Sequence, residues 1–386
     1  MDFQFSAEDE ALRLEFVEWL AANPATEQPG EDDWQRRLRW HRCMNAGGWI
    51  GIGWPKEYGG RGATLSQQVV FNREQARAAR PQLVNTIGIG MVGPTLIRWG
   101  TEEQKRRHVS KILSADEIWC QGYSEPNAGS DVAGLTTRAI ESGDYFVVSG
   151  QKVWTTDAHH ADWCILLCRT DPDAPKHRGI SYLLVDMHSP GVTVRPLKQI
   201  TGDANFNEMF FDEVKVPKQN LVGEKNQGWQ VAITTLMFER SSIGAGLSMA
   251  DAVKDLAVLA KGLPRGSASL WDDSAVRHRI AQFACEAEAL RYTEFRQLTR
   301  QLKGMPPGPE GSILKLGASE LNLRLNSYAM ELLGAYAPLD SGAPFGIDRG
   351  RWSYRMLASR ALTIAGGTSE IQRNIIGERV LGLAKG

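Results

Sequence analysis

Three short stretches of the sequence combine residue types that could hold a cofactor or an anion. CQGYSEPNAGSD at 120–131 is rich in turn-forming residues, hydroxyls and backbone N–H groups, and it contains no GxGxxG that would mark a Rossmann site. KVWTT at 152–156 sets a large aromatic plane before two hydroxyls. AGGTSEIQ at 365–372 places Thr368 after two glycines at the expected start of a helix, where backbone N–H groups attract anions.

Each stretch also has a simpler interpretation. Residues 120–131 could be a surface loop that leads into a β domain, and Trp154 could be an ordinary buried residue of a strand. Thr368 could be a plain N-cap. The local patterns alone leave these alternatives open.

Glu239 is the acidic residue with the strongest case for proton transfer. It follows a run from Asn226 to Phe238 that contains no charged side chain. Apolar surroundings raise the pKa of a carboxylate towards the range that suits a general base. The alternative is a pair of Glu239 and Arg240 on a solvated helix face.

The apolar pattern changes twice along the chain and predicts three domains of an α+β protein. Residues 1–117 are helical in pattern and form the expected N-terminal helical domain. Residues 118–226 hold five short runs rich in β-branched and aromatic residues, which predict a middle antiparallel β domain. Residues 227–386 return to apolar steps of three and four, typical of a C-terminal four-helix bundle.

Local signals support these elements. Ser6 with Asp9 and Thr101 with Gln104 predict capping boxes at two helix starts. The glycine-rich segment 47–63 predicts a loop, and we expect the segment 262–274 to form the turn between two bundle helices.

Composition excludes several classes of protein. The chain has 386 residues with 44 Lys plus Arg and 45 Asp plus Glu, and this near-neutral charge argues against a nucleic-acid binder. No run of eighteen apolar residues predicts a membrane span, and the acidic N-terminus matches no targeting signal, so we expect a cytoplasmic protein.

The cysteines and histidines do not predict a metal site. The five cysteines lack zinc-finger spacing, and Cys164 and Cys168 share one face of a predicted strand. His159 and His160 are adjacent, and neighbours on an extended chain point to opposite faces. We therefore expect reduced structural thiols and loop histidines.

Five motifs, in order and over nearly the whole chain, resemble the acyl-CoA dehydrogenase family. YSEPNAGSD is similar to its TEPGAGSD signature, and GQKVWTTDAHHAD is similar to its GxKxWITN segment. The remaining three motifs are RGISYLLVD, NEMFFDEVKVPKQNLVGEKNQGW and the C-terminal GGTSEIQRNIIGERVLGL.

The resemblance implies the same three domains and an FAD cofactor, with a neighbouring subunit completing the cofactor site. It implies that Ser124 bonds the flavin edge, with the backbone of Tyr123 beside it. Trp154 would pack against the isoalloxazine, and Thr156 would bond its pyrimidine edge.

Four further residues follow from the same resemblance. Gly129 and Ser130 would approach the cofactor and the pyrophosphate of CoA. Thr368 and Glu370 would meet the ribose and pyrophosphate of FAD, although Glu370 replaces the glutamine of many members.

The family reaction removes two hydrogens from the Cα–Cβ bond of an acyl-CoA and gives the trans-2-enoyl-CoA. A carboxylate takes the α-proton, and the β-hydrogen leaves as hydride to the flavin. Many members carry this carboxylate where the present sequence has Gly366, whereas another branch carries it directly before an arginine on the first bundle helix. The resemblance therefore implies Glu239 as the base, with Arg240 as the family arginine and Gly366 offering its N–H to the thioester.

Two family motifs that contribute to FAD binding across subunits are altered in this chain. The Arg-x-x-Phe-Gly motif is replaced by 269–283, and Gln-x-x-Gly-Gly-x-Gly retains only Gly334. Two assemblies stay open: an FAD-binding homo-oligomer, or a heterotetramer with a related chain, as in the actinobacterial members that act on steroid side chains.

The expected partners are an acyl-CoA and an electron-transferring flavoprotein. A catalytically silent subunit, or a flavin oxidase or monooxygenase, are the alternatives to the dehydrogenase.

Overall fold

The computed structural model describes residues 5–78, 80–240, 245–305, 308–340 and 342–385. These residues form two compact units, of which the first spans Ser6–Glu239 and the second contains Arg240–Gly386.

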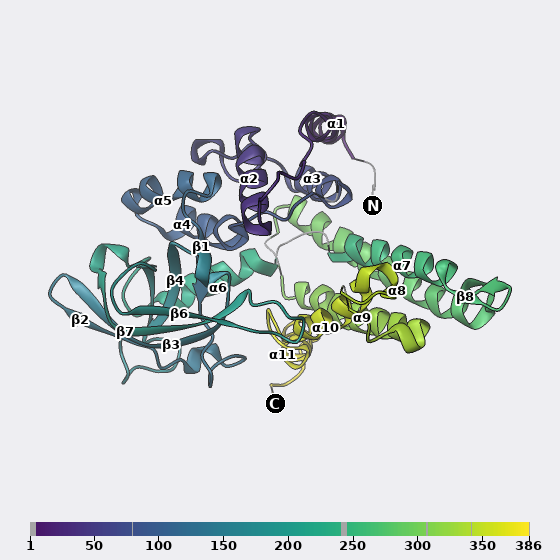
Figure 1. Cartoon of the computed structure of the whole chain (residues 1–386). Coiled ribbons are helices and arrows are strands. Elements are labelled where there is room, and N and C mark those ends of the chain that lie inside the picture. Colours follow the sequence, from purple (N-terminus) through teal and green to yellow (C-terminus); the bar gives the residue numbers. More distant parts are fainter. Residues whose placement is uncertain (1–4, 79, 241–244, 306–307, 341, 386) are drawn as a thin grey trace. The chain divides into compact units, whose positions relative to one another are not determined.

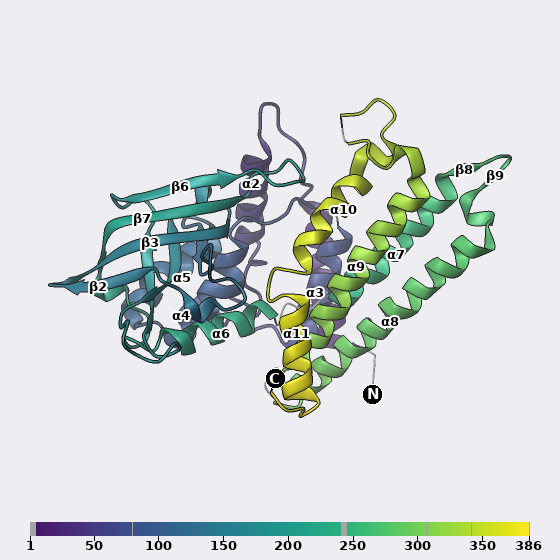
Figure 2. The ribbon, with the colours of Figure 1, turned by 90° about the horizontal axis from the view of Figure 1, so that it is seen from below.

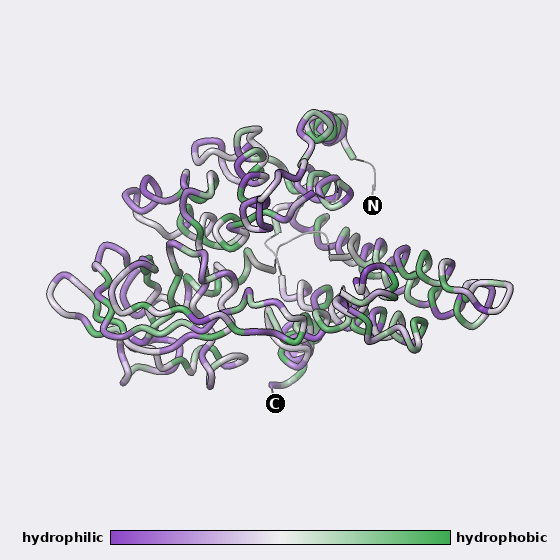
Figure 3. The backbone as a smooth tube through the Cα atoms, viewed as in Figure 1, coloured by the Kyte–Doolittle hydropathy of each residue, from purple (hydrophilic) through white to green (hydrophobic). Residues whose placement is uncertain are grey.

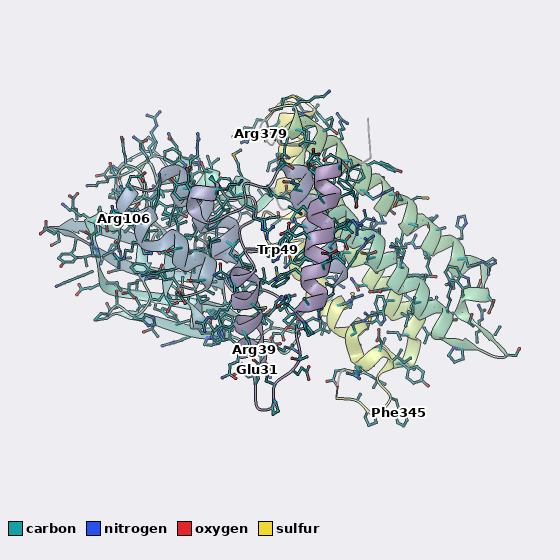
Figure 4. The ribbon with its side chains drawn as sticks, turned by 90° about the horizontal axis from the view of Figure 1, so that it is seen from above. Glu31, Arg39, Trp49, Arg106, Phe345 and Arg379 are labelled. Atoms are coloured by element: carbon teal, nitrogen blue, oxygen red, sulfur yellow. The ribbon has the colours of Figure 1, made fainter. Side chains whose placement is uncertain are left out.

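The first unit begins with helices. These helices are α1 (Ala7–Ala22), α2 (Asp33–Ala46), α3 (Leu65–Arg77), α4 (Gly93–Trp99) and α5 (Glu102–Ser114), and α6 (Gly228–Arg240) follows the strands. The capping boxes predicted for α1 and α5 are confirmed, since Ser6 and Asp9, and likewise Thr101 and Gln104, exchange side-chain and backbone hydrogen bonds. Arg39 of α2 binds Glu31 at 2.7 Å and so holds the loop that leads into α2 (Figure 4).

The predicted loop at 47–63 lies between α2 and α3 and contributes to the core. Trp49, Ile50, Ile52 and Trp54 in this loop are all buried. Its glycines let the chain turn tightly enough to place these side chains inside. A Cβ on Gly60, for example, would lie 2.2 Å from the carbonyl oxygen of Trp54.

A seven-stranded sheet follows in the order β1-β4-β2-β3-β7-β6, with β5 paired to β4. Its strands are β1 (Trp119–Gly122), β2 (Arg138–Ser142), β3 (Tyr145–Thr156), β4 (Trp163–Arg169), β5 (Ile180–Asp186), β6 (Val192–Leu197) and β7 (Phe206–Pro217). The five predicted runs are β3 to β7, whereas β1 and β2 are additional. Most pairs are antiparallel, and Figure 2 shows β2, β3, β7 and β6 side by side. Strand β4 pairs in parallel with β1 and, at one position, with β2.

Both faces of β4 are buried, which explains its unbroken apolar sequence. Trp163, Ile165 and Leu167 belong to the core that the strands share with the helices, on the side where α4 and α5 lie (Figure 1). Cys164 and Cys168 belong to a second core on the other side, which confirms that their thiols share a face. These cysteines are free.

The domain boundaries expected after residues 117 and 226 stay predictions. Helices and strands of the first unit share one hydrophobic core, so compactness does not separate them.

The second unit is helical apart from a short hairpin. Its elements are α7 (Ala245–Gly262), the hairpin of β8 (Pro264–Arg265) and β9 (Ala268–Ser269), α8 (Ser274–Leu302), α9 (Gly311–Leu333), α10 (Arg351–Leu362) and α11 (Ser369–Ile375). Helices α7, α8 and α9 pack on one another, and α10 and α11 pack on α9. Hydrophobic and hydrophilic residues alternate along these helices (Figure 3), and the apolar stripes meet in one core around Phe283, Leu321 and Leu325. The turn predicted at 262–274 is confirmed as the hairpin between α7 and α8.

None of the helices within the described ranges is long and apolar enough to cross a membrane.

Candidate cofactor site

The loop after β1 is a tight turn that leaves its glycine side exposed. The backbones of Glu125 and Ala128 exchange two hydrogen bonds of 3.0 Å, and Pro126 and Asn127 form the tip between them. Gly129 and Ser130 follow and are exposed. A Cβ on Gly129 would meet nothing within 4 Å, so its backbone is open to a ligand.

A bulge in β3 turns Trp154 out of the sheet. Lys152 pairs with Met209 and Thr155 pairs with Asn207, so β3 uses one residue more than β7 over this stretch. Trp154 takes up the extra residue with a φ of 62°, a left-handed conformation that is costly for a side chain of this size.

Trp154 is 61% exposed, and its ring contacts Phe206 edge to face with centroids 6.1 Å apart. The interpretation of Trp154 as an ordinary buried core residue is therefore wrong. The bulge instead presents a fixed aromatic plane on the surface of the unit.

Hydrogen bonds join this bulge to the loop after β1. The Val153 N–H donates to the Ser124 carbonyl at 3.0 Å. Ser124 and Trp154 are thereby held on adjoining segments. Ser124 is half-buried, as is Thr156 two residues beyond Trp154, and neither hydroxyl bonds to any residue in the described ranges.

A buried ion pair also links β3 to the loop after β1. The Lys152 Nζ is 2.9 Å from Glu125 Oε1 and 3.0 Å from the Tyr123 carbonyl oxygen. Glu125 also accepts hydrogen bonds from the backbone N–H groups of Thr136 and Thr137. Burial alone would raise the pKa of Glu125, but the Lys152 charge and these hydrogen bonds outweigh it and lower the pKa to about 2. Burial lowers the pKa of Lys152, and the Glu125 charge opposes that shift.

This pair is not evident from the sequence. The available signal was a charged residue inside a predicted strand, and the partners lie 27 positions apart in the chain.

In the second unit, the two glycines before α11 both have left-handed backbones. Gly366 has a φ of 66° and Gly367 a φ of 93°. The Gln372 side chain donates to the Gly366 carbonyl at 3.0 Å, and the Lys315 Nζ donates to the Gly367 carbonyl at 2.6 Å. These bonds fix the turn and leave the Gly366 position exposed.

Thr368 is the N-cap of α11, as its local pattern predicts, and its hydroxyl accepts from the Ile371 N–H. Glu370 in the first turn is exposed, and hydrogen bonds from its own backbone and from the Thr368 hydroxyl lower its pKa.

The backbone of Glu239 and Arg240 forms the end of α6, and their side chains lie outside the described part of the chain. The preceding turns are firmly anchored. Thr235 is fully buried, and its hydroxyl bonds Thr95 at 2.9 Å and the Tyr182 hydroxyl at 3.3 Å.

His159 and His160 lie on a helical turn, Ala158–His160, rather than on an extended strand, so the argument that they face opposite ways does not apply. Their ring centroids are 4.1 Å apart, and His160 stacks on Trp34. Within the described ranges, no three His, Cys, Asp or Glu residues are grouped so that they could hold a metal ion.

Comparison with known proteins identifies three family domains along the chain. Residues 6–116 match "Acyl-CoA dehydrogenase, N-terminal domain", residues 120–214 match the middle domain, and residues 226–381 match the C-terminal domain.

Individual relatives match over almost their full length. "Acyl-CoA dehydrogenase IpdE1" of Mycolicibacterium smegmatis is 40% identical, with 98% of each chain covered. Among solved structures, a "Tcur3481-Tcur3483 steroid ACAD" chain superposes with a TM-score of 0.88 at 32% identity, with 100% of each chain covered. A chain of the ChsE4-ChsE5 complex from Mycobacterium tuberculosis gives 0.87 at 33% identity, again with 100% of each chain covered.

Proposed function

This chain belongs to the acyl-CoA dehydrogenase family of flavin-dependent oxidoreductases, and we propose that it converts an acyl-CoA thioester to the trans-2-enoyl-CoA with FAD as the cofactor. The observation that carries the proposal is the strained, exposed Trp154, whose neighbour Val153 bonds the backbone of Ser124. A protein gains no stability from holding a large aromatic ring in a left-handed backbone and in water, so the arrangement suits a ligand.

The chemistry of these residues fits a flavin. Trp154 offers a flat apolar plane for the ring system, and the hydroxyls of Ser124 and Thr156 can each donate to or accept from its polar edge. The backbone of Tyr123 lies beside Ser124. FAD, when bound, accepts the β-hydrogen of the acyl chain as hydride.

We assign the α-proton to Glu239. Its support is the uncharged run before it, the anchoring of α6 by Thr235, and the lack of a side-chain carboxylate at Gly366. A base surrounded by apolar residues is poorly solvated, and its pKa rises towards a value that suits removal of a weakly acidic α-proton.

Other residues would bind the rest of the two ligands. The Gly366 N–H would donate to the thioester oxygen, which stabilises the developing enolate, and Arg240 would lie on the substrate side of Glu239. Gly129 and Ser130 would approach the pyrophosphate of CoA. Thr368 and Glu370 would contact the ribose and pyrophosphate of FAD.

We further propose a bulky acyl group, such as one carried on a steroid, and an assembly with a second, related chain. Support comes from the full-length similarity to the steroid ACAD and to a chain of the ChsE4-ChsE5 complex, and from the missing side chain at Gly366. The altered cross-subunit motifs are consistent with such a partner. A homo-oligomer is the alternative assembly, and an electron-transferring flavoprotein is the proposed electron acceptor.

The test is the visible spectrum and solution mass of the purified protein, followed by anaerobic addition of straight-chain, branched and steroid acyl-CoA thioesters. The proposal predicts flavin bands that bleach with at least one thioester, most rapidly with a bulky one. A colourless protein that becomes yellow with a co-expressed related chain supports the two-chain assembly. Bound flavin that no thioester bleaches contradicts the dehydrogenase, and rapid reoxidation by oxygen would indicate an oxidase.

A further inference from the structure

Lys152 and Glu125 form an ion pair in the interior of the first unit. Lys152 is 0% exposed and Glu125 is 6% exposed. Burying two charges is costly, and an apolar pair of similar size often serves stability as well or better. The proposed chemistry gives neither residue a contact with substrate or cofactor. The presence of two buried charges here therefore calls for another explanation.

The pair is held by hydrogen bonds from three segments. Lys152 on β3 bonds the Tyr123 carbonyl and the Glu125 carboxylate of the loop after β1. The other Glu125 oxygen accepts from both the backbone N–H and the hydroxyl of Thr136, at 2.7 and 2.8 Å. A buried hydrogen-bond network of this kind rigidifies the segments it joins.

This network encloses Ser124. The Lys152 ammonium donates hydrogen bonds to the carbonyl of Tyr123, which precedes Ser124, and to the carboxylate of Glu125, which follows it. The Ser124 carbonyl itself is held by the Val153 N–H, one residue beyond Lys152. Three consecutive loop residues are thus fastened to two consecutive residues of β3.

The same bonds lie directly beside the bulge. Val153 bonds Ser124, and the next residue, Trp154, has the left-handed φ of the extra residue in β3. We propose that Lys152 and Glu125 are positioning residues that set Ser124 and Trp154 in the geometry required to bind the flavin. The proposal rests on the proposed function, because it takes these two residues as flavin contacts.

The test uses the full-length holoprotein and a neutral double variant, Lys152→Met with Glu125→Gln. Each single substitution leaves a buried charge without its partner, whereas the double variant removes both charges and keeps the side-chain volumes similar. Glu117→Gln is the matched control. Glu117 is also a buried carboxylate of the first unit, bound to His108 at 2.7 Å and to Lys111 at 3.1 Å. Within the described part of the chain, its carboxylate bonds neither the loop after β1 nor the bulge.

Two readouts distinguish positioning from general support of the fold. We expect the double variant to bind FAD about tenfold or more weakly than the parent, and we expect its bound flavin to have a different visible circular dichroism. Glu117→Gln should change neither readout, at a melting temperature comparable with that of the double variant. FAD affinity and dichroism equal to the parent in the double variant would overturn the proposal, and so would equal losses in the double variant and the control.

Amide hydrogen exchange over residues 150–157 separates this proposal from the proposed function. Exchange at Val153 reports its bond to Ser124 with or without flavin. We expect it to be at least tenfold faster in the double variant than in the parent and unchanged in Glu117→Gln. If the parent binds no FAD either alone or with a co-expressed related chain, the proposed function fails. The exchange result still decides whether the ion pair holds β3 against the loop after β1, and equal exchange in all three proteins would refute that role.

Discussion

Replacement of Trp154 by alanine should weaken FAD binding without unfolding the protein. Trp154 is 61% exposed, so roughly 150 Å² of an indole surface of roughly 250 Å² is free to contact a ligand. A flat ring packed on one face covers about half of that, and roughly 75 Å² at about 25 cal/mol per Å² gives about 2 kcal/mol. This corresponds to a dissociation constant raised about 30-fold.

The assay is titration of the flavin-free protein with FAD, followed by fluorescence or calorimetry. Trp154→Phe keeps an aromatic plane and should lose less affinity than Trp154→Ala. Ile140→Ala, at an exposed apolar residue of β2 in the same unit, should leave affinity unchanged. An affinity of Trp154→Ala within twofold of the parent would refute the assignment of this ring to the cofactor.

Trp154→Gly provides an internal check on the backbone argument. Glycine adopts a φ of 62° without the steric cost of about 1 kcal/mol that alanine bears. Trp154→Gly should therefore be the more stable of the two variants, although glycine is normally the poorer strand residue. A less stable glycine variant would show that the bulge does not have the left-handed conformation.

Two further predictions concern stability. Gly228→Ala should strongly destabilise the first unit, by about 2 kcal/mol or more, because the new Cβ would lie 2.5 Å from the Tyr182 backbone nitrogen. Gly129→Ala, where the new Cβ would meet nothing within 4 Å, should preserve the melting temperature. Equal melting temperatures for the two variants would contradict the packing at the start of α6. The pKa of Glu125 is about 2 in the folded protein, against its usual 4.5. The ionised carboxylate therefore adds to the free energy of unfolding above pH 4.5, and this contribution, of up to about 3 kcal/mol, is lost as the pH falls towards 2. Urea unfolding between pH 6 and 3 should therefore show a shallower acid loss in Lys152→Met with Glu125→Gln than in the parent, and parallel curves would contradict it.

Much of the fold follows from local sequence signals. The capping boxes at Ser6 and Thr101 were predictable because each needs only two residues three positions apart. The shared face of Cys164 and Cys168 followed from strand alternation. The family motifs indicated the loops that we propose to face the cofactor.

What the sequence could not supply depends on contacts between distant segments. Strand β1 is only four residues long, and it is identified by its parallel pairing with β4. The left-handed φ of Trp154 could not be predicted from its residue type, because a tryptophan in a strand pattern predicts an ordinary buried position. The bond between Lys152 and Glu125 requires the bulge and the loop to be placed first.

The most direct test of the proposed chemistry is anaerobic mixing of the flavin-loaded Glu239→Gln variant with the best acyl-CoA substrate of the parent, monitored by flavin absorbance. Glutamine keeps the size of the side chain and cannot take up the α-proton. The account predicts normal FAD content, a normal melting temperature and bleaching slowed by about a thousandfold or more, as expected for loss of a general base. Bleaching at the rate of the parent would contradict it and would direct the search for the base to another residue or to a partner chain.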